Sequence, residues 1–280
     1  MAVDPWAGGR GRRSGSRPPP RESVPRSGAG APPAAAAASA RELRLYGVNA
    51  VSAVFRRRPD AIRKLYLGEA RIPVLQPLLK WCAANRVGYR VVEDDDLRKL
   101  AASSHHEGVV ADVLREPPLV LADWLDALPS GPQCAIWLDG VGNPHNLGAI
   151  LRSAAHFGVA AILLPRDSTL ALSGAAARVA EGGAEAVPMV RLDDNPASLA
   201  RLREAGFSLA ATVVDGGDDL FAAALPERLV YVLGAEGEGM DRGLAAECDL
   251  QLSIPGSGAV ESLNVASATA VLLAAWWRTP

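Results

Sequence analysis

The sequence of 280 residues is poor in cysteine, in long apolar runs and in net charge. Its cysteines, Cys82, Cys134 and Cys248, form no CxxC pair, and their odd number argues against a disulfide framework and fits a reducing cytoplasm. An uninterrupted apolar run of about 18 residues, as a membrane helix needs, is missing, so no membrane span is expected. A net charge of -2 does not by itself indicate a nucleic-acid partner.

Histidine patterns that would bind a metal are also missing. His105 and His106 are neighbours beside an expected strand, where consecutive side chains point to opposite faces and make a poor chelate. His145 stands alone in a polar loop. We therefore expect no metal site.

The first forty residues differ from the rest in composition. They are rich in Gly, Pro, Ser and Ala and carry six arginines against Asp4 and Glu22. Such a segment buries too little apolar surface to offset the entropy of ordering, so a disordered basic tail is expected over 1–40. It is either inert or a non-specific tether for phosphates.

Residues 41–115 predict a small α/β domain, because helical and strand-like apolar patterns alternate along them. Helical spacing covers 46–55, 72–85 and 96–103, and strand patterns cover 62–67, 89–92 and 108–114. Four prolines then make 116–133 an expected linker, with a short helix near 124–128.

Residues 134–280 contain a second α/β series. Apolar runs bounded by glycine or proline are typical of strands covered on both faces, so a mainly parallel sheet is expected. The expected strands are 135–138, 161–164, 186–190, 208–213, 229–233 and 250–254, and the expected helices are 147–157, 173–181, 197–205 and 261–277.

Three segments of this second domain carry candidate site residues. The first is LDGVGNPHNLGAILR, residues 138–152, in which a buried strand ends in an Asp-Gly turn and a polar loop. Asn146 is expected at the helix N-cap, and Arg152 follows within the helix. Both are expected to face the carboxyl end of the strand, where α/β proteins bind ligands. Alone, the pattern is better explained by a helix cap and a surface arginine than by a site.

The second segment is VLGAEGEGM, residues 232–240, in which an apolar strand runs into a loop with Gly234, Glu236 and Glu238. Glycines at a strand end let backbone amides approach a ligand closely. The loop lacks the Gly-Lys-Ser/Thr of a P-loop and the glycine spacing of a dinucleotide site. Its carboxylates favour hydroxyl or cationic partners, and a flexible turn is the alternative.

The third segment is IPGSGAVESLNVASATA, residues 254–270. A Gly-rich loop delivers Ser262, Leu263 and Asn264 to the expected start of the last helix. Ser262 fits a helix cap as well as a site residue. Burial of Asn264 would require hydrogen-bond partners.

Together the three segments resemble the signature of the SpoU-type (TrmH-type) ribose methyltransferases of the SPOUT superfamily, over nearly all of 135–280. The preceding domain, with YGVNAV and HHEGVVA, is similar to the L30e-like RNA-binding domain found before such catalytic domains. The resemblance implies an α/β-knot fold, a parallel sheet with a C-terminal trefoil knot, and a homodimer with the site near its interface. Trp276 and Trp277 are then candidates for the interface or for the core.

The resemblance also implies the chemistry, which is transfer of a methyl group from S-adenosylmethionine to a ribose 2′-hydroxyl in RNA. The implied catalytic residues are Arg152, Asn146, Glu236, Ser262 and Asn264, and the implied cofactor-binding positions are Gly234, Ile254 and Leu263. The expected substrate is a guanosine of 23S rRNA. The alternatives are a tRNA 2′-O-methyltransferase and a non-catalytic RNA-binding protein with the same fold. A nucleotide-dependent oxidoreductase is disfavoured, because no Gly-x-Gly-x-x-Gly follows the first strand.

Overall fold

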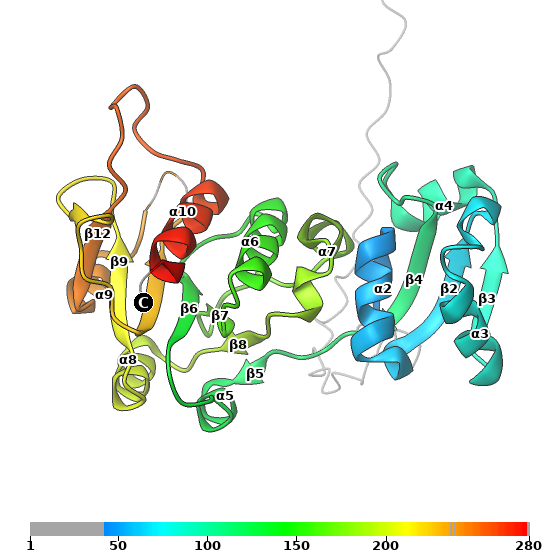
Figure 1. Cartoon of the computed structure of the whole chain (residues 1–280), viewed down its shortest axis with the longest axis horizontal. Coiled ribbons are helices and arrows are strands. Elements are labelled where there is room, and N and C mark those ends of the chain that lie inside the picture. Colours follow the sequence, from blue (N-terminus) through cyan, green and yellow to red (C-terminus); the bar gives the residue numbers. More distant parts are fainter. Residues whose placement is uncertain (1–41, 236, 238, 279–280) are drawn as a thin grey trace, which may run out of the picture.

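The computed structural model describes residues 42–235, 237 and 239–278, which form two α/β domains side by side (Figure 1). The expected basic tail, 1–40, lies outside the described residues. In the described part of the chain, no helix is long and apolar enough to cross a membrane. Likewise, the described residues hold no group of three or more His, Cys, Asp or Glu placed to bind a metal ion.

The first domain is a four-stranded sheet with helices on both faces. Its strand order is β1-β4-β2-β3, in which only β2 and β3 are parallel. The elements are β1 (Glu42–Tyr46), α2 (Val48–Arg57), β2 (Ile62–Leu67), α3 (Gln76–Ala84), β3 (Gly88–Val91), α4 (Asp94–Ala101) and β4 (Val109–Leu114), with short 3-10 helices η1 (Pro59–Ala61) and η2 (Glu69–Arg71). The three expected helices and three expected strands are confirmed. Strand β1 was not expected, and it forms by antiparallel pairing with β4.

The second domain is built on an eight-stranded sheet in which every neighbouring pair is parallel, as expected. The strand order is β10-β12-β9-β11-β6-β7-β8-β5. The strands are β5 (Leu119–Val120), β6 (Gln133–Leu138), β7 (Ala161–Leu164), β8 (Met189–Arg191), β9 (Ser208–Thr212), β10 (Asp218–Asp219), β11 (Arg228–Leu233) and β12 (Leu250–Ser253). The helices are α5 (Leu121–Asp126), α6 (Pro144–His156), α7 (Gly174–Ala180), η3 (Gly183–Glu185), α8 (Asn195–Glu204), α9 (Arg242–Glu247) and α10 (Val265–Trp277).

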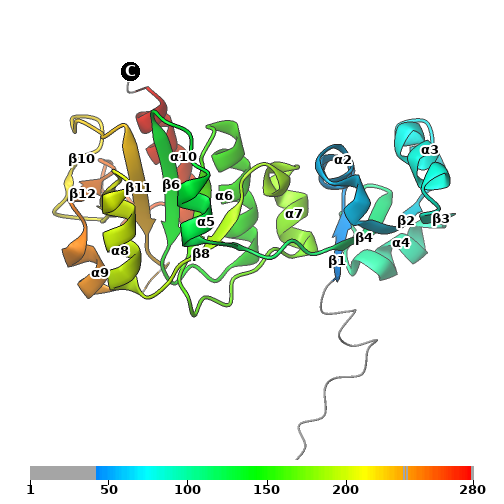
Figure 2. The ribbon, with the colours of Figure 1, turned by 90° about the horizontal axis from the view of Figure 1, so that it is seen from below.

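Helices cover both faces of this sheet (Figure 2). On one face, α6, α7 and α10 pack over Ile136, Ile162 and Tyr231. On the other, α5, α8 and α9 pack over Trp137 and Val232. Burial on both faces explains why the strands read as continuous apolar runs rather than as alternating patterns.

The segment expected to be a linker, 116–133, contributes to the second domain. Its residues Leu119 and Val120 form the edge strand β5, which pairs with β8, and α5 follows at once. The two domains are therefore connected by only a few residues that belong to neither sheet.

Polar contacts and apolar packing hold the domains together. Arg58, just after α2, forms a two-pronged ion pair with Glu185 of η3, with both N–O distances 2.7 Å. Arg178 of α7 donates to Glu107 of the first domain at 2.6 Å. Ala177 of α7 lies in the hydrophobic core of the first domain. The relative position of the domains is therefore set by a packed interface, not by the connecting segment alone.

Candidate active site

The three segments meet at the carboxyl edge of the parallel sheet. Strands β6, β11 and β12 end at Leu138, Leu233 and Ser253, and only β9 lies between β11 and β12. Because parallel strands end at the same edge, the loops that follow them are neighbours. The sequence could not establish this neighbourhood, because it depends on the strand order.

Asp139 connects the loops after β6 and β11. Its backbone N–H donates to the carbonyl of Leu233 at 2.8 Å, and its carboxylate accepts from the N–H of Asp241 at 2.9 Å. Sequence reasoning did not single out Asp139. The available signal was the Asp-Gly turn directly after a buried strand.

Gly234 begins a tight turn in the second segment. The Ala235 N–H donates to the Gly239 carbonyl, and the Gly239 N–H donates to the Ala235 carbonyl, both at 2.9 Å. A Cβ atom at position 234 would lie 2.3 Å from the Gly239 carbonyl carbon and the Met240 nitrogen, so only glycine fits. The backbone therefore turns back on itself at the edge where a ligand is expected.

Asn146 and Asn264 join the first and third segments. The Asn264 side-chain amide donates to Oδ1 of Asn146 at 3.2 Å. Asn146 is only 9 % exposed, whereas Asn264 is exposed. Two side chains that are far apart in the sequence thus lie together where α6 and α10 begin.

Both helix starts differ from the expected ones. Asn143, not Asn146, caps α6, because its side chain accepts from the His145 N–H at 2.9 Å. Helix α10 begins at Val265, and Asn264 rather than Ser262 caps it by accepting from the Ala266 N–H at 2.9 Å. The expectation of a cap at Asn146 was therefore wrong, and Ser262, which fitted either a cap or a site residue, is not the cap. Each helix is capped by the residue whose oxygen reaches its first unpaired N–H groups.

Ser262 and Leu263 lie in the loop that precedes α10, and both are exposed. Ile254 is half-buried at the end of β12. Among the described residues, Ile254 and Leu263 take part in no backbone–backbone hydrogen bond outside the helices and strands. Backbone donors and acceptors beside apolar side chains suit an adenosine-like ligand, so Gly234, Ile254 and Leu263 stay the predicted contacts of S-adenosylmethionine.

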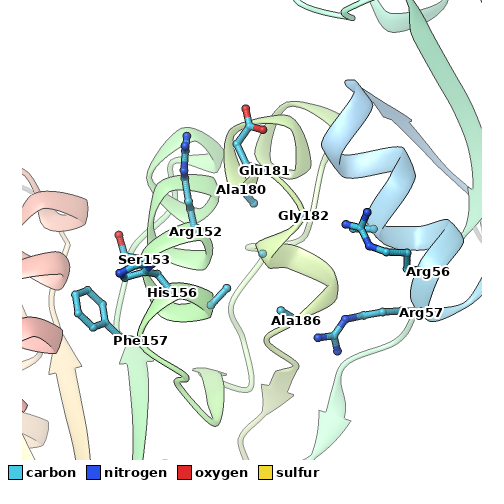
Figure 3. A pocket seen from close by; sticks show the side chains of 13 residues that line it. Arg56, Arg57, Arg152, Ser153, His156, Phe157, Ala180, Glu181, Gly182 and Ala186 are labelled. Carbon is cyan, nitrogen blue, oxygen red and sulfur yellow. The ribbon is translucent and has the colours of Figure 1, made fainter. Parts of the chain in front are cut away.

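Arg152 does not contact Asn146 or Asn264. It lies six residues after Asn146, which turns its side chain about two-thirds of a turn away around α6. Its side chain is exposed and lines a groove between α6 and α2, beside Glu181 (Figure 3). The expectation that Asn146 and Arg152 both face the strand-end loop therefore holds for Asn146 only.

Glu236 lies outside the described residues, so its role stays a prediction. It stands between Ala235 and Gly239, whose backbone groups form two hydrogen bonds with each other.

Tyr231 of β11 connects the sheet to α10. Its hydroxyl donates to the carbonyl of Leu272 in α10 at 3.1 Å, and burial raises its pKa far above the ordinary value. The phenol therefore remains a neutral donor and holds α10 against the sheet. This keeps Asn264, at the start of α10, beside α6.

Comparisons with known proteins identify the family. The SpoU rRNA Methylase family matches residues 133–274, and the RNA 2′-O ribose methyltransferase substrate-binding family matches residues 44–118. The chain belongs to the SpoU rRNA methylase family and is an RNA methyltransferase. Its substrate-binding domain and its methylase domain coincide with the two α/β domains of the fold.

Two relatives illustrate this membership. The chain is 40 % identical to the uncharacterized tRNA/rRNA methyltransferase YfiF of Escherichia coli O157:H7, over 85 % of this chain and 69 % of that protein. It is 36 % identical to the 23S rRNA (guanosine-2′-O-)-methyltransferase RlmB of Nitrosomonas europaea, over 82 % of this chain and 88 % of that protein.

Solved structures agree with the fold. An RNA methyltransferase of the TrmH family from Porphyromonas gingivalis superposes with a TM-score of 0.67 at 26 % identity, covering 85 % of this chain and 90 % of that one. The SpoU methyltransferase AviRb of Streptomyces viridochromogenes, solved in complex with its cofactor AdoMet, superposes with a TM-score of 0.71 at 22 % identity, covering 86 % and 90 %. The α/β fold expected from the resemblance to SpoU-type enzymes is confirmed.

Proposed function

We propose that this chain transfers a methyl group from S-adenosylmethionine to the ribose 2′-hydroxyl of a guanosine in 23S rRNA. Family membership supports the reaction, and relatives named for this substrate, such as the RlmB proteins of Nitrosomonas europaea and Ralstonia nicotianae, support the target. The observation that carries the proposal is the Asn264–Asn146 hydrogen bond, which brings the first and third segments together at the carboxyl edge of the sheet.

Arg152 is proposed to bind the reacting ribose. A guanidinium loses its proton only above about pH 12, so Arg152 acts as a donor rather than as a base. Its N–H groups stabilise the negative charge that develops on the 2′-oxygen, while a phosphate of the RNA accepts the proton. Among the described residues, no carboxylate forms an ion pair with Arg152, which leaves its donors available.

The remaining predicted residues are proposed to hold cofactor and ribose. Backbone groups at Gly234, Ile254 and Leu263 bind the cofactor, which supplies an electrophilic methyl group when bound. Asn146 and Asn264 position the start of α6 and α10 around it, and Glu236 and Ser262 contact the ribose or the cofactor.

Assembly and location complete the proposal. We propose that the chain acts as a homodimer in the cytoplasm, where rRNA is modified. Trp277, at the end of α10, is 62 % exposed and lies against the ring of Phe157, the residue that follows α6, with ring centroids 6.4 Å apart. Trp276 instead packs on the core and donates to the carbonyl of Pro226, so Trp277 is the tryptophan proposed for the interface.

The test is methylation of 23S rRNA by the purified full chain with S-adenosylmethionine, with 2′-O-methyl sites mapped by mass spectrometry. We expect one modified guanosine, and a fall in kcat of about 10²–10³-fold for Arg152→Ala, as when one donor to a developing oxyanion is removed. The matched control is Arg201→Ala, which removes an exposed arginine from α8 on the opposite face of the sheet.

Other outcomes would assign the chain differently. Methylation of tRNA but not of 23S rRNA would favour the tRNA alternative. Absence of S-adenosylmethionine binding in calorimetry would favour a non-catalytic RNA-binding protein. Full activity of the Arg152→Ala protein would remove Arg152 from the proposed mechanism.

A further inference from the structure

A groove of about 670 Å³ runs between the substrate-binding and methylase domains. Helix α2 forms one wall with Ala53, Arg56 and Arg57, and α6 forms the other with Arg152 and His156. The turn from α7 into η3 lines its base. Figure 3 shows Arg56 and Arg57 on the α2 side and Arg152 on α6 across the groove.

The groove is strongly cationic. Arg56, Arg57 and Arg152 are all exposed, and none of them forms an ion pair with a described residue. Glu181 is the one acidic side chain among the described lining residues, and it already accepts from Asn49 at 2.5 Å and from Arg178. Three guanidinium groups therefore share a concave surface with a single carboxylate among the described lining residues, and this excess of positive charge attracts a polyanion.

Arg58 differs from Arg56 and Arg57 in its exposure and in its ion pair. It follows Arg57 directly, yet its side chain is only 20 % exposed and is paired with Glu185. Arg56 and Arg57 instead extend into the groove. Of these three consecutive arginines, Arg58 stabilises the domain interface, and the N–H groups of the other two face the groove.

The two domains are joined beside the groove. The Arg58–Glu185 pair and the contact of Arg178 with Glu107 connect the first domain to η3 and α7, and Ala177 packs in the core of the first domain. Gly47 allows the close approach, because a Cβ there would lie 2.4 Å from Cδ of Arg178. A charged surface that is already ordered binds an RNA strand with a smaller loss of conformational entropy.

We propose that this groove is the path of the RNA backbone to Arg152, and that Arg56 and Arg57 bind its phosphates. The inference rests on the proposed function, because it takes Arg152 as the residue at the reacting ribose. Guanidinium groups bind phosphate through paired N–H donors, and such contacts set the register of a strand without reading its bases. The substrate-binding domain thus acts on the reaction through two arginines that face the methylase domain.

The test is the double variant Arg56→Ala/Arg57→Ala in the full chain, with 23S rRNA as the probe. We expect the KM for RNA to rise about tenfold or more while kcat at saturating RNA and S-adenosylmethionine affinity stay unchanged. The slope of log K against log salt concentration should fall by about 1.4, as for two lost contacts with a single strand. Arg56→Lys/Arg57→Lys should retain most of the affinity, because phosphate also accepts a point charge.

The matched control is Lys80→Ala/Arg90→Ala, which removes two exposed cations from α3 and β3 at the far end of the first domain. An equal loss of affinity in this control would mean unspecific attraction and would overturn the proposal. So would a lower melting temperature of Arg56→Ala/Arg57→Ala with unchanged RNA affinity, because the two arginines would then only stabilise the carboxyl end of α2. A change in oligomeric state alone would assign them to a protein contact instead.

The inference fails separately from the proposed function. If the wild-type chain methylates no RNA, the proposed function is wrong. If it methylates RNA and the double variant has an unchanged KM and salt slope, only the groove assignment is wrong.

Discussion

Asn264 at the start of α10 donates its side-chain amide to Oδ1 of Asn146 in the first turn of α6, 3.2 Å away. The same Asn264 side chain caps α10 through its oxygen. One residue thus stabilises a helix with its acceptor and connects two loops of the site with its donor. The two roles can be separated by substitution.

Asn264→Asp should keep the helix cap and lose the donor to Asn146. We expect the free energy of unfolding to change little, because aspartate caps helices as well as asparagine does. Methyl transfer should fall, because the hydrogen bond from Asn264 to Asn146 is lost and the two loops shift. Asn264→Ala should remove the cap as well as the donor. We expect its free energy of unfolding to be about 1 kcal/mol lower than that of the wild type in urea denaturation. If Asn264→Asp methylates RNA at the wild-type rate, the link to Asn146 has no role in positioning.

Glu185→Gln should destabilise the domain interface. Its side chain is 6 % exposed, and the substitution leaves the Arg58 guanidinium without its buried anionic partner. We expect the free energy of unfolding to fall by roughly 3 kcal/mol. Glu116→Gln is the control, because Glu116 lies 3.6 Å from the same guanidinium but is 70 % exposed, so its loss should cost less than about 1 kcal/mol. Equal costs for the two variants in urea denaturation would contradict this ranking.

Gly234→Ala should disrupt the turn after β11. The new Cβ would meet backbone atoms of Gly239 and Met240 at 2.3 Å, so the loop has to open. We expect weaker S-adenosylmethionine binding in calorimetry and a far-UV circular dichroism spectrum close to that of the wild type. Gly256→Ala serves as control, since nothing lies within 4 Å of a Cβ there and its backbone is not left-handed. Unchanged cofactor binding in Gly234→Ala would exclude this turn from the cofactor site.

Glu181 should make stability depend on pH. Hydrogen bonds from Asn49 and Arg178 and the nearby charges of Arg178 and Arg152 lower its pKa, so the folded chain binds its proton less readily than the unfolded chain. The resulting stabilisation is present above the ordinary glutamate range, near about pH 4.3, and is lost as the pH falls through the lower folded pKa. Wild type should therefore melt higher than Glu181→Gln at neutral pH, with the difference vanishing in acid. Glu204→Gln, an exposed glutamate of α8, serves as the control. A difference independent of pH would contradict the lowered pKa.

The sequence predicted most elements of the fold, because apolar periodicity is a local property. The buried runs that became β6, β7 and β11 were recognised, and so were the helices α2, α6 and α7. The strands that were not predicted are those that form only by pairing with a strand distant in the sequence. Strand β1 exists because β4 pairs with it, and β5 exists because β8 offers an edge to Leu119 and Val120.

The candidate site was predicted in part. Asn146, Asn264 and Gly234 do lie at one edge of the sheet, and the motifs in which they stand had indicated this region. Six residues separate Asn146 from Arg152, so helical geometry already turns the two side chains to different faces of α6. The partners of each side chain depend on the tertiary structure: Asn146 meets Asn264 at the start of α10, and Arg152 lies in the groove beside Glu181.

The sequence by itself determined the class of this protein, since its three segments carry the residue types of a SpoU methylase in the right order and its apolar runs specify a parallel sheet. Only the tertiary structure decided which side chains meet. Strand order placed the loops after β6, β11 and β12 together, and the packing of α7 against β1 set Arg56 and Arg57 opposite Arg152. These relationships depend on contacts between residues more than a hundred positions apart in some cases, such as Arg58 with Glu185, and no local pattern encodes them.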